Sequence, residues 1–97
     1  MTSQDQEYTL RKNERALKYE LLIDATVAGH ASYKRVGDAL VLPHTVVEPE
    51  FRGRGLSKPL IQYALDDARA QGLKVEPLCS AVRDFIDHNA EYRDLTA

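Results

Sequence analysis

The sequence contains one cysteine, no tryptophan and no apolar run long enough to cross a membrane. One cysteine excludes an internal disulfide, and the polar start of the chain lacks the apolar segment of a signal peptide. We therefore expect a cytoplasmic protein that contacts no membrane. The formal charge is −2 with no basic tail, which argues against a nucleic-acid partner.

The length of the chain limits its organisation. At 97 residues, we expect a single domain over residues 1–97, with the polar residues 1–6 frayed. A chain of this size buries a modest core, so we expect a monomer or a weak homodimer. The 3 histidines are not spaced as metal ligands on a helix or strand would be, so the sequence predicts no metal site.

Alternating apolar and polar residues predict antiparallel strands in the first half of the chain, over residues 8–12, 17–23, 27–35 and 39–47. Gly37 and Asp38 predict a hairpin turn before the last of these. That last strand is so apolar that we expect both of its faces to be buried. Pro43 predicts a local irregularity within it, because proline cannot donate a hydrogen bond to a sheet.

A helical period replaces the alternation in the second half. Apolar residues recur at three- and four-residue spacing over residues 56–68 and predict a helix that ends at Gly72. A short strand over 73–76 and a second helix over 80–88 follow. A helix that joins two strands makes them parallel neighbours. The predicted fold is therefore α+β (α/β), a mostly antiparallel sheet with a strand–helix–strand crossover and a C-terminal helix.

Residues 52–57, Arg-Gly-Arg-Gly-Leu-Ser, lie where the last antiparallel strand gives way to the first helix. A helix N-terminus has unpaired N–H groups and a dipole that favours anions, and two arginines add positive charge. Gly53 and Gly55 let the backbone turn tightly and approach a ligand. The pattern suits a phosphate, although on its own it is also typical of an ordinary turn.

The same residues resemble the Q/R-x-x-G-x-G/A signature of the GNAT superfamily of acetyl-coenzyme A-dependent N-acetyltransferases. Ser57 stands where that family usually has glycine or alanine, but it is small and can cap a helix, so we expect the pocket to survive. Residues 44–47, 75–80 and 88–95 resemble, in the same order, a small single-domain GNAT-like family of about this length. The resemblance spans residues 7–95 and implies an abbreviated GNAT fold, without the two helices that usually follow the first strand.

The resemblance also implies a donor, an acceptor and a binding site. The chain would transfer an acetyl group from acetyl-coenzyme A to an amine of a small molecule or a peptide. The alternative is a non-catalytic acyl-coenzyme A-binding or protein-interaction module, because much of the usual acceptor-binding wall is missing. The residues expected to hold the coenzyme are Thr45, Val46, Val47, Arg52, Gly53, Arg54, Gly55, Leu56, Ser57 and Lys58. For Lys58, the alternative is an ordinary solvated lysine on the surface.

Cys79 and His44 are the candidate catalytic residues. Cys79 ends a predicted strand and precedes a helix, whose dipole would lower the pKa of the thiol. In the GNAT fold the two parallel strands diverge at this point, so the resemblance places Cys79 near the thioester, with His44 as its base. The alternative is that Cys79 is a small buried residue and His44 a hydrogen-bonded core histidine.

Four further features have both a chemical and a structural interpretation. Glu48 is a second candidate base, or a solvated residue beside Pro49. Tyr92 is a general acid, or the residue that packs the C-terminal tail against the core. His88 fits the end of the second helix, where the dipole favours a cation. We expect a small basic cluster to be a solvated edge, formed by Arg11, Lys12 and Arg15.

Overall fold

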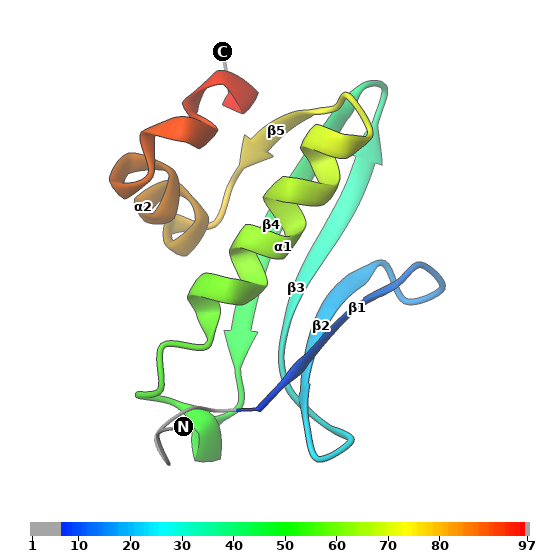
Figure 1. Cartoon of the computed structure of the whole chain (residues 1–97). Coiled ribbons are helices and arrows are strands. Elements are labelled where there is room, and N and C mark those ends of the chain that lie inside the picture. The colour runs from blue at the N-terminus through cyan, green and yellow to red at the C-terminus, as the bar shows by residue number, and fades with distance from the viewer. Residues whose placement is uncertain (1–6, 97) are drawn as a thin grey trace.

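The computed structural model describes residues 7–96 and contains one sheet of five strands, with both α-helices on the same face (Figure 1). The first four strands are antiparallel neighbours, and the fifth pairs parallel to the fourth. The strands, in their order across the sheet, are β1 (Thr9–Asn13), β2 (Lys18–Ile23), β3 (Thr26–Val36), β4 (Ala39–Val47) and β5 (Lys74–Pro77). This confirms the predicted α+β fold, whereas residues 1–6, expected to be frayed, lie outside the described residues.

Two α-helices and two short 3₁₀ segments complete the chain: η1 (Pro49–Phe51), α1 (Ser57–Ala70), α2 (Ser80–His88) and η2 (Ala90–Thr96). Helix α1 connects β4 to β5, so the β4–α1–β5 unit is the predicted crossover. Gly72, with a φ of 71°, follows the end of α1, as predicted. No helix within residues 7–96 is long and apolar enough to cross a bilayer.

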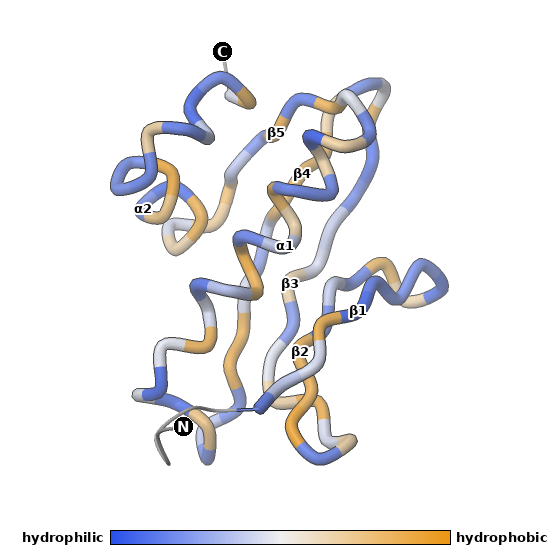
Figure 2. The backbone as a smooth tube through the Cα atoms, in the orientation of Figure 1, coloured by the Kyte–Doolittle hydropathy of each residue, from blue (hydrophilic) through white to orange (hydrophobic). Residues whose placement is uncertain are grey.

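Helix α1 is fixed to the sheet by the predicted apolar stripe. Leu60, Ala64 and Leu65 are completely buried and belong to the same core cluster as Tyr19 and Leu21 of β2. Figure 2 shows apolar and polar residues alternating along α1, as expected of a helix with one face on a sheet. Packing of this apolar stripe against the core therefore holds the N-terminus of α1 at the end of β4.

Two strand predictions need correction. Leu17 is not part of β2: it has a φ of 58°, is 49% exposed and belongs to the turn after β1. Strand β4 is continuously buried only up to Leu42, and His44 and Val46 are exposed. The reason is that His44 and Val46 point to the face of the sheet that neither α-helix covers.

Pro43 causes the irregularity predicted for it. Ser32 of β3 pairs with His44 and Lys34 pairs with Val41, so two residues of β4 lie opposite one residue of β3. Such a β-bulge reverses the alternation of side chains along a strand. Leu42 faces the core before the bulge, and after it the next core-facing position is residue 45 instead of residue 44.

Two residues of the basic cluster expected to be a solvated edge are instead paired, whereas Arg15 is exposed as predicted. Arg11 Nε lies 2.6 Å from Glu20 Oε1 on β2, and Lys12 Nζ lies 2.9 Å from Asp67 Oδ2 on α1. The Tyr19 hydroxyl donates to the same Asp67 oxygen at 2.7 Å. The pairing was not predicted because Glu20 and Asp67 are distant in sequence from their partners. Asp67 thus ties the β1–β2 hairpin to α1.

We expect Asp67→Asn to lower the free energy of unfolding at pH 7 by roughly 1–3 kcal/mol, because it removes charged hydrogen bonds to Lys12 and Tyr19. Burial alone would raise the pKa of Asp67, but these hydrogen bonds outweigh it and hold the pKa below the ordinary value of 3.8. The contribution of Asp67 is therefore present above pH 3.8 and is lost as the pH falls through its folded pKa.

Urea unfolding at several pH values measures this effect. The free energies of unfolding of the wild type and Asp67→Asn should differ at neutral pH and become equal in acid. Glu14→Gln is the matched control, because Glu14 also lies near Lys12, at 3.7 Å, but its side chain is 78% exposed. An equal loss of stability in both variants, or a difference that persists in acid, would contradict this role of Asp67.

Candidate functional site

The glycine-rich loop lies between η1 and α1, at the end of β4. Gly53 and Gly55 have φ values of 84° and 70°, which other residues rarely adopt. A Cβ atom added at either glycine would meet no protein atom within 4 Å. The backbone conformation therefore requires glycine at both positions, and the space beside them is open.

Helix α1 begins without a side-chain cap. Its N-cap is Leu56, whose side chain is buried in the core, and its first turn contains no acidic residue. The expectation that Ser57 would cap the helix is therefore wrong, because Leu56 is the N-cap residue and Ser57 is the first helical residue. With no capping side chain, the N–H groups of the first turn and the helix dipole favour an anion.

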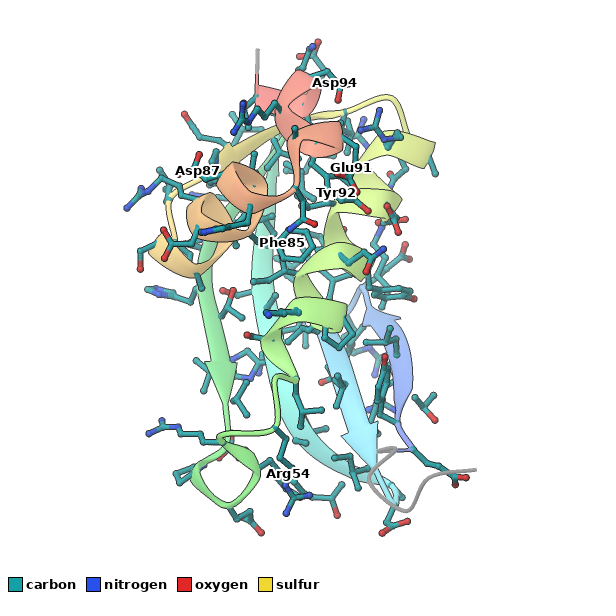
Figure 3. All side chains as sticks on the ribbon, turned by 60° about the vertical axis from the view of Figure 1, so that its left-hand side comes forward. Arg54, Phe85, Asp87, Glu91, Tyr92 and Asp94 are labelled. Atoms are coloured by element: carbon teal, nitrogen blue, oxygen red, sulfur yellow. The ribbon has the colours of Figure 1, made fainter. Side chains whose placement is uncertain are left out.

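The loop gathers positive charge around this helix start. Residues 52–58 include Arg52, Arg54 and Lys58 and no acidic residue. Arg52 Nε donates to the Val47 carbonyl at 3.0 Å, which fixes the loop to the end of β4. The Arg54 guanidinium lies 5.3 Å from the centre of the Phe51 ring, and Figure 3 shows Arg54 at the loop end of the molecule.

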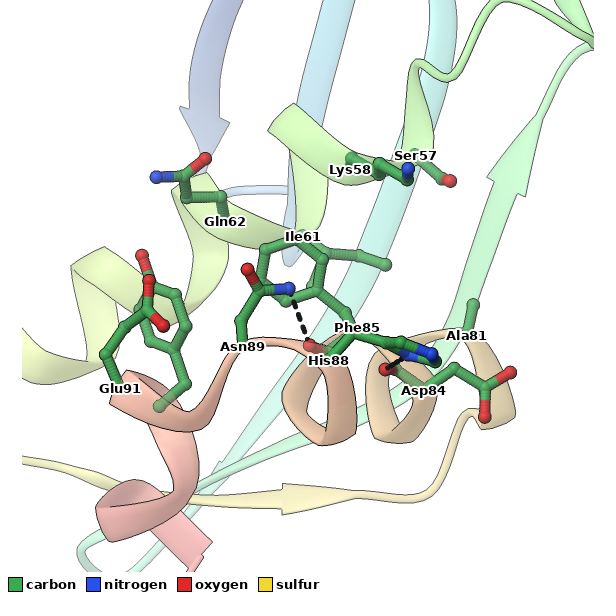
Figure 4. A pocket seen from close by; sticks show the side chains of 11 residues that line it. Ser57, Lys58, Ile61, Gln62, Ala81, Asp84, Phe85, His88, Asn89 and Glu91 are labelled. Atoms are coloured by element: carbon green, nitrogen blue, oxygen red, sulfur yellow. Dashed lines mark hydrogen bonds between the residues drawn. The ribbon is translucent and has the colours of Figure 1, made fainter.

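A groove of about 710 Å³ lies between α1 and α2 (Figure 4). It begins at the first turn of α1, directly after the glycine-rich loop, and ends at the C-terminal tail. The residues that line it are Ser57, Lys58, Ile61 and Gln62 of α1, Ala81, Asp84, Phe85 and His88 of α2, and Asn89, Glu91 and Tyr92. Of these residues, only Ser57 and Lys58 were expected to hold the coenzyme, because the sequence does not show how α2 lies against α1.

His88 and Asn89 complete the C-terminal end of α2. His88 Nδ1 lies 2.8 Å from the Asp84 carbonyl, which can only accept, so this nitrogen carries the proton. The expected position of His88 in the last turn is confirmed. The capping residue itself is Asn89, whose side-chain amide donates to the Phe85 carbonyl at 2.8 Å.

Tyr92 anchors the tail that closes the groove. Its side chain is buried, and its hydroxyl donates to Asp66 Oδ1 of α1 at 2.7 Å. Burial and the Asp66 carboxylate raise the pKa of Tyr92, so the hydroxyl keeps its proton and directs it toward Asp66. Arg69 holds the same tail through two hydrogen bonds to Asp94, of 2.9 and 3.0 Å, and Figure 3 shows Tyr92 and Asp94 on this tail. This geometry favours the packing role over that of a general acid.

Cys79 lies where β4 and β5 diverge. The paired residues end with Leu42 and Pro77, and the Cys79 N–H then donates to the Leu42 carbonyl at 3.1 Å. Cys79 is half-buried and is the N-cap residue of α2. Burial alone would raise the pKa of the Cys79 thiol, but the Thr45 hydroxyl and the backbone N–H groups of Val82, Ala81 and Thr45 outweigh it and lower the pKa.

His44 is on the other face of the sheet. Thr45 pairs with Ala31, which is buried under α1, whereas His44 pairs with Ser32 on the exposed face. No hydrogen bond joins His44 to Cys79 among the described residues. The structure therefore brings Cys79 together with Thr45 and not with His44. Glu48, the other candidate base, follows β4 and is half-buried.

Comparisons with known proteins agree on a family. Residues 18–95 match the family model of GCN5-related N-acetyltransferases. Protein NATD1 from Bos taurus, and likewise from Homo sapiens, is 36% identical to this chain over 58 residues, or 59% of the chain. That match covers 51% of each relative, so the chain spans about half the length of the curated relatives it matches.

Two solved structures share the fold. A GCN5-like candidate N-acetyltransferase from Staphylococcus aureus superposes with a TM-score of 0.69 at 22% identity, covering 90% of this chain and 85% of that one. The ribosomal-protein-S18-alanine N-acetyltransferase from Escherichia coli gives a TM-score of 0.64 at 21% identity, covering 78% and 52%. At these identities the similarity concerns the fold alone.

Proposed function

Because the chain belongs to the family of GCN5-related N-acetyltransferases, we propose that it transfers an acetyl group from acetyl-coenzyme A to the amine of a small molecule or a peptide. One observation carries this proposal: an uncapped helix start, with three cationic residues within residues 52–58, opens directly into a groove of about 710 Å³. A pyrophosphate attached to a long organic arm matches such a site.

The loop would hold the pyrophosphate. The first-turn N–H groups of α1 can donate to phosphate oxygens, and Gly53 and Gly55 leave the approach to them free of side chains. Arg54 and Lys58 would add positive charge. Arg52 would act mainly on the shape of the loop, because its Nε already donates to the Val47 carbonyl.

The acyl end would lie against the second half of β4. Coenzyme A supplies an acetyl group activated as a thioester, and the protein must orient it and its acceptor. Strand β5 pairs with β4 only as far as Leu42, so the backbone of Thr45, Val46 and Val47 can pair with an extended ligand on that side. Ala81 lines the groove near this gap and lies two residues after Cys79. The donor would therefore reach from the loop to Cys79.

Cys79, without the His44 partner that the sequence suggested, is the residue that we propose for catalysis. The Cys79 thiolate would attack the acetyl carbonyl carbon, forming a new C–S bond as the bond to the coenzyme sulfur breaks and the departing thiolate takes a proton from solvent. Attack by the amine then forms the C–N bond and returns the Cys79 thiolate. Because His44 lies on the exposed face of β4, away from Cys79, the proton that the attacking amine loses would pass to solvent.

An assay of free thiol released from acetyl-coenzyme A, with a panel of small amines and peptides, tests the proposal. Release should depend on the amine, and mass spectrometry should find the same quantity of acetylated product. If acetyl-coenzyme A binds but no acceptor causes release of free thiol, the alternative of a non-catalytic acyl-coenzyme A-binding module is favoured. Failure to bind acetyl-coenzyme A at all would contradict both.

A further inference from the structure

Thr45 has a buried hydroxyl without an ordinary partner. In residues 7–96, Thr45 Oγ1 is the one buried side-chain nitrogen or oxygen that makes no hydrogen bond of normal length and angle. Burying an unpartnered hydroxyl is unfavourable, so such an atom in a folded protein calls for a physical explanation. The explanation must come from the groups that surround it.

The group that the Thr45 hydroxyl faces is the Cys79 thiol. The N–H groups of Thr45, Ala81 and Val82 also lie toward the sulfur, but the Val82 N–H donates to the Cys79 carbonyl at 3.1 Å and the sulfur caps no N–H of α2. A neutral thiol is a weak acceptor, which fits a contact too loose to count as an ordinary hydrogen bond. A thiolate is a much stronger acceptor and would complete the arrangement. The buried, unpartnered Thr45 hydroxyl beside the sulfur therefore suits the ionised form of Cys79.

The bulge at Pro43 produces this arrangement. Leu42 faces the core, so regular alternation would place His44 on the core face beside Cys79 and Thr45 on the exposed face. The extra residue in β4 reverses these directions, and Thr45 pairs with the buried Ala31. The Cys79 N–H bond to the Leu42 carbonyl, at 3.1 Å, holds the start of α2 against the same stretch of β4.

We propose that Thr45 is a positioning residue that stabilises the Cys79 thiolate by donating its hydroxyl hydrogen to Sγ. Ionisation of Cys79 releases its proton to solvent. The catalytic meaning of the thiolate rests on the proposed function, but its stabilisation by Thr45 does not.

The single cysteine makes the test direct, because alkylation by iodoacetamide reports on Cys79 alone. The rate is measured against pH without any acyl donor. Thr45→Val keeps the shape of the side chain and removes the hydroxyl, so it should raise the pKa of the thiol by about one unit. Because a more basic thiolate is also more nucleophilic, alkylation at neutral pH should slow only roughly threefold.

Two further variants separate a hydrogen bond from a change in packing. Thr45→Ser keeps the hydroxyl and should restore the wild-type pH profile. His44→Gln alters the other face of the sheet and should leave the profile unchanged. If Thr45→Val unfolds the protein, Thr45→Ala repeats the test with a smaller side chain. A folded Thr45→Val or Thr45→Ala variant with the wild-type profile would overturn the inference, as would a shifted profile in His44→Gln alone.

The alkylation result is independent of catalysis. If the protein transfers no acetyl group but the thiol pKa is still raised in Thr45→Val, the proposed function is refuted and the inference about Thr45 stands. Acetyl transfer by the wild type, with an unshifted profile in Thr45→Val, would refute the inference alone.

Discussion

Gly55→Glu is expected to lower the affinity for acetyl-coenzyme A by roughly 100-fold or more, a loss of about 3 kcal/mol of binding free energy. Gly55 lies just before the uncapped first turn of α1, and a side chain added there would meet no protein atom within 4 Å. The new carboxylate would therefore enter the space beside the helix start, where it would repel a pyrophosphate and compete for the N–H groups. Titration calorimetry measures the affinity.

Gly37→Glu is the matched control. Gly37 also has a positive φ, of 61°, and an added Cβ would meet no protein atom within 4 Å. It lies in the β3–β4 turn, at the opposite end of β4 from the loop. Both variants should lose similar stability through backbone strain, but only Gly55→Glu should lose affinity. Equal losses of affinity, or wild-type affinity in folded Gly55→Glu, would contradict the site.

Cys79→Ala is expected to lower the rate of amine-dependent thiol release by roughly a thousandfold or more, because removing a nucleophile closes the covalent route. Affinity for acetyl-coenzyme A should change little, since the proposed phosphate contacts lie in residues 52–58. In the wild type, mass spectrometry without an amine should detect one added acetyl group on Cys79. The release assay and the intact mass together check both expectations.

Cys79→Ser serves as the control for shape. It keeps a small polar side chain at the N-cap of α2, but its hydroxyl does not ionise near neutral pH, so it should be as inactive as Cys79→Ala. An active Cys79→Ser would show that the position needs only a polar group of this size. Wild-type turnover in Cys79→Ala would show that the amine attacks acetyl-coenzyme A directly and that positioning suffices.

Most of the fold could be predicted because the periodicity of the sequence changes at the glycine-rich loop. Strand alternation before Val47 and the helical stripe after Gly55 gave the correct elements, and α2 occupies the predicted residues 80–88. Segment η2 was missed because only Tyr92 and Leu95 of its residues are buried, and two apolar residues three apart are a weak signal.

Side-chain directions at the site could not be predicted in the same way. Pro43 indicated an irregularity. Which face of the sheet the side chains of His44 and Thr45 point to depends on how β4 pairs with β3, and the sequence does not give that register. This is why the sequence paired Cys79 with His44 and the structure places Thr45 beside it. The groove depends on the contact of α1 with α2, and no local pattern encodes that contact.

The central claim is that acetyl-coenzyme A binds along the glycine-rich loop and the groove between α1 and α2. An NMR titration of the isotopically labelled protein with acetyl-coenzyme A tests it most directly, because each backbone amide reports on its own surroundings. The largest shifts should occur in residues 52–58 and in Ala81 and Phe85, which line the groove, whereas Lys34 on the exposed face should barely move. Shifts concentrated on the exposed face of β3 and β4, with residues 52–58 unchanged, would contradict it.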